Sequence, residues 1–148
     1  DQWLADNKLQ WVTEARQTVG DLLKTRGERS LLIISPSESV ASAIDTLRSA
    51  GISQLPVLDQ GKPVGSVQEV TLARILHDHR DPETIAVGDI MAKPLPLVEA
   101  STNLDEAYRL LLAGNTGVLA VHEGEVLGIV TRIDLINYWN PVRKDPTK

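Results

Sequence analysis

The chain has 148 residues and a formal net charge of −5, from 15 basic and 20 acidic side chains. This length fits one ordinary domain or two very small ones that share a core. The absence of Cys excludes a disulfide scaffold, a Cys-ligated zinc site and a thiolate nucleophile. The acidic balance argues against a nucleic-acid or anionic-membrane partner, although a local basic patch is compatible with it.

Hydrophobic residues make up 42% of the chain, but there is no Phe and only one Met. The core must therefore be built from Leu, Ile, Val and Ala. The apolar runs are only a few residues long, far from the roughly 20 that span a bilayer. No charged-then-apolar segment opens the chain, so we expect no signal peptide. The composition predicts a soluble, cytoplasmic α/β protein.

An internal repeat determines the predicted architecture. Four blocks of sequence recur in the same order in the two halves of the chain. The pairs are 19–23 with 87–91, 37–47 with 101–111, 55–57 with 119–121, and 64–67 with 127–130. Similar apolar helices alone would not reproduce all four blocks in order. We therefore predict two copies of one supersecondary unit.

The first copy is predicted to open with a buried strand over 31–34. A helix follows with Ser37 as its expected N-cap. Its apolar stripe has the spacing of one buried helical face and comprises Val40, Ala43, Ile44 and Leu47. Two strands over 55–58 and 64–67 then form a hairpin around Gly61, and a closing helix covers about 70–77.

The second copy repeats this order, β-α-β-β-α. It has a strand over 95–98, a helix capped by Thr102, strands over 119–121 and 126–130, and a closing helix over about 133–139. The expected stripe comprises Leu104, Ala107, Tyr108 and Leu111. We divide the chain into an N-terminal helix and lead-in (1–18), repeat 1 (19–80), repeat 2 (81–140) and a C-terminal tail (141–148).

Two strings identify a family resemblance. They are Gly51-Ile52-Ser53-Gln54-Leu55-Pro56-Val57 in the first copy and Gly128-Ile129-Val130-Thr131-Arg132-Ile133-Asp134-Leu135 in the second. With the tandem β-α-β-β-α units, they resemble the CBS domain pair, or Bateman module. This resemblance implies an α/β fold of two repeats packed about a pseudo-two-fold axis, which commonly dimerises and binds an adenosyl ligand.

The two ends of the chain suggest a narrower resemblance. The opening Asp1-Gln2-Trp3-Leu4, the lead-in before the first repeat and the ending 133–138 look like the C-terminal regulatory region of cystathionine β-synthase. In that enzyme a pyridoxal-phosphate catalytic domain precedes the CBS pair. CBS pairs are also attached to many unrelated proteins, so the parent stays open.

Thr131 and Asp134 stand three positions apart at a strand-to-helix junction. Free N–H groups and the positive end of the helix dipole lie at such a junction. The resemblance implies that the Asp134 carboxylate binds the vicinal hydroxyls of a ribose, while the Thr131 hydroxyl bonds a ribose oxygen or a phosphate. The same spacing also fits an ordinary capping box, with Thr131 as the N-cap.

The first copy has Gln68 and Thr71 at the positions of Thr131 and Asp134. Because Thr71 offers no carboxylate to hold two hydroxyls, we expect one working adenosyl site rather than two.

The resemblance implies further ligand contacts. The backbone of the 52–55 string would read the adenine edge, and apolar side chains would line the pocket. The residues implied are Ile52, Ser53, Gln54, Leu55, Leu32, Ile33 and Ile133. For Leu55 the alternative is plain core packing, and Ile133 packs either beside the ribose or in the core.

The ligand itself is S-adenosylmethionine if the parent is a cystathionine β-synthase, and AMP, ADP or ATP if phosphates are bound. Phosphates need nearby Lys or Arg; Arg132 adjoins the motif but is expected to be solvated, and Lys93 is expected to face the companion site. His77 and His79 are interpreted as imidazoles at a helix end. No metal site is expected.

The leading functional hypothesis is a regulatory module, without catalytic residues or a cofactor of its own, that controls an attached or partner catalytic domain. Ligand binding would favour one arrangement of the two repeats. The alternative is a structural or dimerisation module with a vestigial site. No nucleophile–base constellation, P-loop or Gly-x-Gly-x-x-Gly string supports an enzyme. A homodimer is the expected assembly, with Trp3, Trp11 and Trp139 either at its interface or sealing the N-terminal helix onto the last helix.

Overall fold

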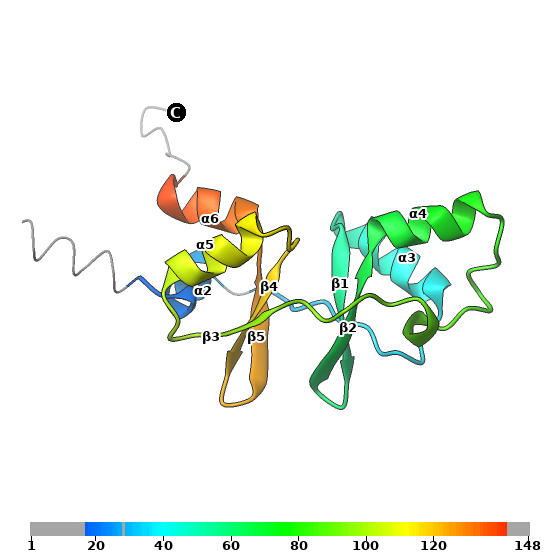
Figure 1. The fold of residues 1–148 in the computed structure, drawn as a ribbon, viewed down its shortest axis with the longest axis horizontal. Coiled ribbons are helices and arrows are strands. Elements are labelled where there is room, and N and C mark those ends of the chain that lie inside the picture. The colour runs from blue at the N-terminus through cyan, green and yellow to red at the C-terminus, as the bar shows by residue number, and fades with distance from the viewer. Residues whose placement is uncertain (1–16, 28, 142–148) are drawn as a thin grey trace, which may run out of the picture. The chain divides into compact units, whose positions relative to one another are not determined.

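The computed structural model describes residues 17–27 and 29–141 (Figure 1). The helix expected within 1–18, with Trp3 and Trp11, and nearly all of the tail lie outside these residues. The chain divides into two compact units. We call Ser30–Leu95 the central unit, and Asp1–Arg29 with Pro96–Lys148 the discontinuous unit.

The central unit contains an antiparallel hairpin and two α-helices. Its elements, in chain order, are α3 (Val40–Ala50), β1 (Gln54–Asp59), β2 (Lys62–Gln68), α4 (Glu69–His77) and the 3-10 turn η1 (Val87–Asp89). The two strands pair from Gln54 opposite Gln68 to Asp59 opposite Lys62. The predicted strands and helices of the first copy are confirmed from α3 to α4, with ends that differ by at most two residues.

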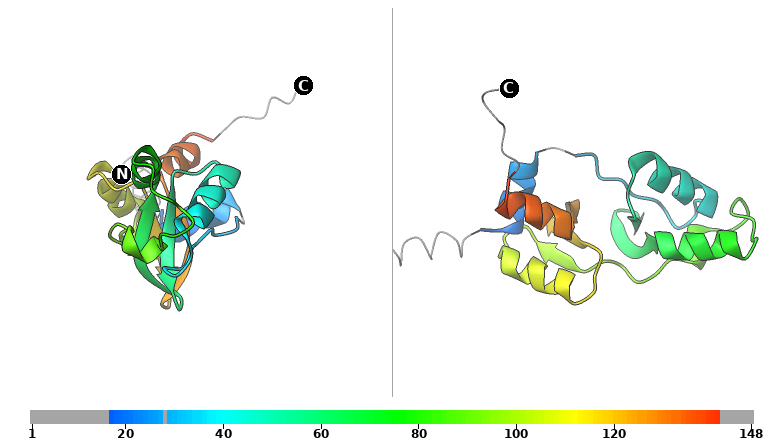
Figure 2. Two further views of the ribbon diagram at one scale, coloured as in Figure 1. Left: turned by 90° about the vertical axis from the view of Figure 1, so that its right-hand side faces the viewer. Right: turned by 90° about the horizontal axis from the view of Figure 1, so that it is seen from above.

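The discontinuous unit adds a third strand to the same plan. Its elements are α2 (Val19–Arg26), β3 (Leu97–Glu99), α5 (Leu104–Leu112), β4 (Val118–His122), β5 (Glu125–Val130) and α6 (Arg132–Trp139). Strand β4 is central, parallel to β3 and antiparallel to β5. Helix α6 contacts both α2 and α5 (Figure 2). The expected α/β class is confirmed.

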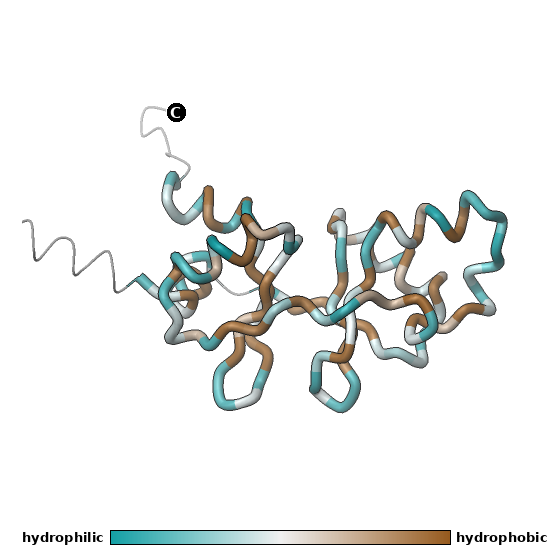
Figure 3. Tube along the Cα trace, in the orientation of Figure 1, coloured by the Kyte–Doolittle hydropathy of each residue, from teal (hydrophilic) through white to brown (hydrophobic). Residues whose placement is uncertain are grey.

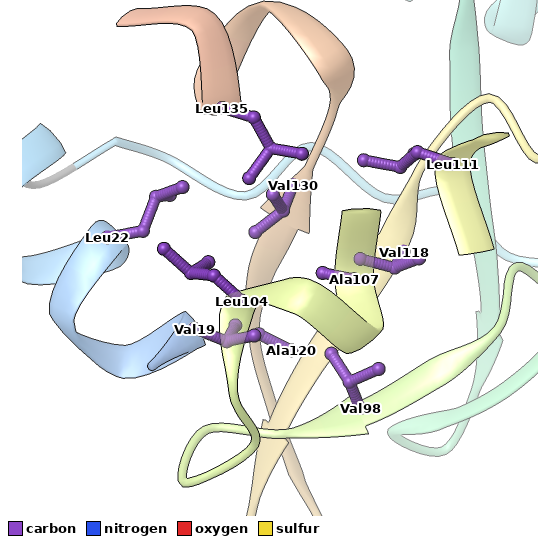
Figure 4. Close-up of a cluster of buried hydrophobic side chains, with 10 residues drawn as sticks. All are labelled: Val19, Leu22, Val98, Leu104, Ala107, Leu111, Val118, Ala120, Val130 and Leu135. Carbon is purple, nitrogen blue, oxygen red and sulfur yellow. The ribbon is translucent and has the colours of Figure 1, made fainter. Parts of the chain in front are cut away.

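Each unit has a core of aliphatic side chains. In the discontinuous unit, ten buried residues from the three helices and the three strands meet (Figure 4). A second core fills the central unit and includes Val40, Ala43 and Leu47 of the expected helical stripe. In the second stripe Tyr108 is an exception, since it is 43% exposed. The hydropathy trace shows apolar strands that end in polar hairpin tips (Figure 3).

The two hairpins turn in the same way. Gln60 and Gly61 both have positive φ, as do Glu123 and Gly124. Two successive residues with positive φ make a type I′ turn, whose twist matches that of the strands it joins. The expected glycine-containing hairpin loops are thus confirmed in both units.

The helix caps differ from the prediction by a few residues. Ser39, not Ser37, caps α3 and accepts a hydrogen bond from the N–H of Ser42 at 3.1 Å. Asn103, not Thr102, caps α5 and accepts from the N–H of Asp105 at 2.8 Å. In both cases the cap is the extended residue just before the first helical turn, where its side chain reaches the free N–H groups.

The buried strand expected over 31–34 is wrong for most of its length. Only Ile34 pairs, through an isolated parallel bridge to Val57, and it is 2% exposed. Leu32 and Ile33 are 38% and 47% exposed. The apolar run predicts a fully buried strand, whereas only its last side chain enters the core. In the second copy, the strand expected over 95–98 forms as β3, shifted to Leu97–Glu99.

The first residues of each repeat, within 19–23 and 87–91, hydrogen-bond to the segment just before the other repeat's helix α5 or α3. These two segments are called the lead-ins of their repeats from here on. The N–H groups of Val19 and Gly20 donate to the carbonyls of Thr102 and Ala100, at 2.9 and 2.8 Å. A Cβ on Gly20 would lie 3.1 Å from the Ala100 oxygen, so glycine permits this close approach.

The central unit repeats this arrangement. There, Val87 and Gly88 donate to Glu38 and Pro36, at 2.8 and 2.9 Å. As a result, the lead-in of the first sequence repeat belongs to the discontinuous unit and that of the second belongs to the central unit.

Candidate functional site

Asp134 is the one buried ionisable residue in the described part of the chain, with a side chain 4% exposed. It lies in the first turn of α6, with Thr131 as the N-cap. Its Oδ2 accepts hydrogen bonds from the backbone N–H of Thr131 at 2.9 Å and from the Thr131 hydroxyl at 3.0 Å. The capping contact that the spacing allows is therefore present.

Two arginines also bind this carboxylate. Nη1 of Arg26, at the end of α2, lies 3.1 Å from Asp134 Oδ2, and Nη1 of Arg29 lies 3.3 Å from Oδ1. The two side chains differ in exposure: 12% for Arg26 and 56% for Arg29. Arg26 Nη1 also donates to the carbonyl of Ile129 at 2.7 Å, which fixes its guanidinium beside the end of β5.

Burial lowers the pKa of the Arg26 guanidinium; Asp134 acts to raise it and Arg29 to lower it. Because arginine normally titrates far above neutral pH, Arg26 stays charged despite this shift. Among the described residues, its Nε is buried with no hydrogen-bond acceptor. Arg26 therefore depends on Asp134 for compensation of its charge.

The Asp134 carboxylate is crowded with hydrogen-bond donors. A carboxylate has about four acceptor positions, and the four donors described here already occupy that number. Oδ2 has three of these donors and Oδ1 has only Arg29. Of the two oxygens, Oδ1 is thus the less crowded.

Ile133 accompanies Thr131 and Asp134 in the discontinuous unit, where its side chain is 57% exposed on α6. Of the two alternatives for Ile133, packing in the core is therefore wrong, and a position beside the ribose stays a prediction.

The other predicted site residues lie in the central unit. Ile52 is 37% exposed and Ser53 is exposed in the turn before β1, while Gln54 is 8% exposed at its start. Leu55 is fully buried in the core of the unit. Leu32 and Ile33 are exposed, as described above. A composite pocket from both sets of residues stays a prediction.

The equivalent position in the first repeat carries no comparable charge cluster. Gln68 is the N-cap of α4 but makes no capping hydrogen bond with its side chain. Its Nε2 instead donates to the hydroxyl of Ser66 at 3.1 Å. Thr71 occupies the place of Asp134. The two repeats therefore differ at the residues from which a single site was predicted.

Sequence reasoning missed Arg26 and Arg29. They lie 108 and 105 positions from Asp134 in the sequence, so no local motif links them to the carboxylate. Arg132 is exposed, as predicted, but its guanidinium is also anchored to the protein. Its Nε and Nη2 donate to the carbonyl of Leu111, at 3.1 and 2.9 Å.

The remaining polar candidates are local. His77 ends α4, and its Nδ1 lies 3.0 Å from an Asp78 carboxylate oxygen. Within residues 17–27 and 29–141, no cluster of three or more His, Asp or Glu could hold a metal ion. In the same residues, every helix is too short or too polar to cross a membrane.

The chain is similar in sequence and in structure to proteins that contain CBS domains. The CBSX2 protein of Arabidopsis thaliana, a chloroplastic CBS domain-containing protein, is 30% identical over 158 residues, covering 86% of this chain and 66% of CBSX2. The crystal structure of CBSX2 in complex with AMP matches with a TM-score of 0.69 and 31% identity, covering 83% of this chain and 96% of that one.

A second relative is a larger enzyme. The cystathionine beta-synthase of Dictyostelium discoideum is 26% identical over 154 residues, which cover 93% of this chain and 30% of the enzyme. The chain spans between 21% and 66% of the length of such curated relatives. Finally, the family model described as CBS domain matches residues 19–78 and 87–140. The chain belongs to the CBS domain family and carries two copies of the domain in tandem.

Proposed function

We propose that this CBS pair is a regulatory module that binds one adenosyl ligand, an adenine nucleotide or S-adenosylmethionine. Asp134 and Thr131 would hold the ribose, and the 52–55 string would contact the adenine in a composite site. Binding would favour one arrangement of the two units and so change the activity of an attached or partner catalytic domain in the cytoplasm. A cystathionine β-synthase is one such parent.

The observation that carries this proposal is the buried carboxylate of Asp134 at the start of α6. A buried carboxylate is costly, and here it is held by two arginines and by the helix N-terminus. Only the second repeat has it. The AMP complex of CBSX2 supports an adenosyl ligand, and the similarity to a cystathionine beta-synthase supports that parent.

A specific observation also favours the alternative of a structural module with a vestigial site. The capping contact and both ion pairs already fill the acceptor positions of Asp134. In that case the ion pair between Asp134 and Arg26 serves only to hold α2 against α6. Ligand titration distinguishes the two hypotheses.

We expect isothermal titration of the full chain with S-adenosylmethionine, AMP, ADP and ATP to give saturable heat for at least one ligand, at one site per chain. The near-isosteric Asp134→Asn should weaken binding about tenfold or more, because one charged acceptor for the diol is lost. Circular dichroism must show that the variant is folded at the titration temperature.

Thr71→Ala is the matched control, because it changes the equivalent position of the first repeat and should leave affinity unchanged. No heat from any of the four ligands would contradict the proposed function and favour the structural module. Undiminished binding by a folded Asp134→Asn would instead contradict the site assignment.

We also propose that the module is a homodimer, in line with the family resemblance. Exposed apolar side chains gather on α5 and α6: Tyr108, Leu112, Ile133, Ile136 and Trp139 are 43–62% exposed. The rings of Tyr108 and Trp139 pack edge to face with centroids 5.8 Å apart, so apolar side chains of the two helices meet at the surface. Such a surface is typical of an interface.

Sedimentation at high micromolar concentration should therefore give a dimer, and Ile136→Glu should shift it toward monomer by about tenfold or more in dissociation constant, since a charge would be buried. Ser49→Glu, on an exposed polar position of α3, is the charge-matched control and should have no effect. A monomeric wild-type chain would refute the homodimer, and an unshifted Ile136→Glu dimer would refute this surface as its interface.

A further inference from the structure

The two arginines that contact Asp134 differ in burial and in how firmly they are held. This difference bears on which ligand the site would prefer. Arg26 is nearly buried and makes two contacts, to Asp134 Oδ2 and to the Ile129 carbonyl. A Cβ added to Gly128 would lie 3.1 Å from its Nη2, so the backbone of β5 closes on this guanidinium. Arg26 is therefore a fixed partner of the carboxylate.

Arg29 is held far less tightly. Its side chain is 56% exposed, and its 3.3 Å contact is the longest of the four around the carboxylate. Within the described residues, Asp134 is its recorded ion-pair partner. Solvent screens the exposed guanidinium of Arg29, which weakens its attraction to the carboxylate. Arg29 is thus the donor that a ligand hydroxyl can replace at Oδ1.

The exchange leaves a positive charge beside the ribose. The single negative charge of Asp134 can compensate one guanidinium charge. Arg26 remains the paired arginine because its side chain is nearly buried. Once a diol occupies Oδ1, the charge of Arg29 is no longer paired there. A phosphate on the ribose would offer it a bidentate acceptor, whereas a sulfonium and an ammonium group would repel it.

We propose that Arg29 is the residue that determines ligand specificity, favouring an adenosyl ligand with a phosphate over one with a cationic sulfonium. This inference rests on the proposed function, in which Asp134 binds the ribose hydroxyls. Arg26 acts as the positioning residue that keeps the carboxylate in place during the exchange.

The test is calorimetric titration of the full chain with AMP, adenosine and S-adenosylmethionine. The wild type should bind AMP about tenfold or more tightly than adenosine, as expected for one additional charge-assisted contact. S-adenosylmethionine should bind more weakly than AMP. Raising the salt concentration should reduce the preference for AMP, because the contact is partly exposed.

Arg29→Gln should bring the affinities for AMP and adenosine within about threefold of each other, the change falling on AMP. Arg29→Lys should restore part of the preference, since it keeps the charge but loses the planar fork. Arg48→Gln, at an exposed arginine in the last turn of α3, is the matched control and should leave all three affinities unchanged.

The outcomes separate the two proposals. If AMP and adenosine bind equally well to the wild type, or if S-adenosylmethionine binds more tightly than AMP, the role of Arg29 is refuted while the adenosyl-binding function stands. The same holds if Arg29→Gln keeps the full preference. If none of the three ligands binds, the proposed function and the role of Arg29 both fail.

Discussion

Asp134→Ala is expected to lower the free energy of unfolding by about 3 kcal/mol. This is the typical cost of removing one partner of a buried ion pair while the other partner stays charged. The substitution removes the acceptor of both arginine contacts and of the Thr131 N–H. Arg26 is the reason for the large effect, because its charge is nearly buried and would be left without compensation. Urea unfolding followed by far-UV circular dichroism measures the change.

Two further variants show whether the ion pair is the cause. Asp105→Ala removes an exposed first-turn carboxylate from α5 and should cost less than about 0.5 kcal/mol. In the double variant with Arg26→Met, the uncompensated charge is gone, so the loss should be smaller than the sum of the two single losses. Strictly additive losses would contradict this account of the pair.

Gly65→Ala is expected to lower the free energy of unfolding by about 2 kcal/mol through overpacking. A Cβ at this position of β2 would lie 2.5 Å from Sδ of Met91 and 2.9 Å from the carbonyl oxygen of Ala92. The methionine can move, but the carbonyl is held by the paired hydrogen bonds between Ser66 and Ala92, at 3.0 and 2.8 Å. The same urea titration measures this loss.

Met91→Ala separates the two clashes. In the double variant the sulfur is absent, so part of the cost of Gly65→Ala should disappear while the part due to the Ala92 carbonyl remains. A loss below about 0.5 kcal/mol for Gly65→Ala alone would show that the segment after η1 moves away freely. That result would contradict the tight packing described for this segment.

The repeat made most of the fold predictable from the sequence. Periodic apolar residues located α3 and α5, and glycine positions located both hairpins, because these signals are local. The strand over 31–34 failed for the opposite reason. Whether Leu32 and Ile33 are covered depends on tertiary packing, which an apolar run by itself does not specify.

The candidate site was predicted only in part. Asp134 and Thr131 were found because their spacing is a local motif at a helix start. Arg26 and Arg29 lie about a hundred positions away in the sequence, and only the packing of α2 against α6 brings them to the carboxylate.

The exchange of lead-ins between the units has a consequence for how such a chain could arise. A single half, from Val19 to the end of α4, would begin with a lead-in that has no binding partner in that half. Its partner is the segment just before the first long helix of another half. Two identical halves would satisfy each other by swapping these segments, as domain-swapped dimers do. Duplication and fusion of such a half would then join two swapped partners in one polypeptide.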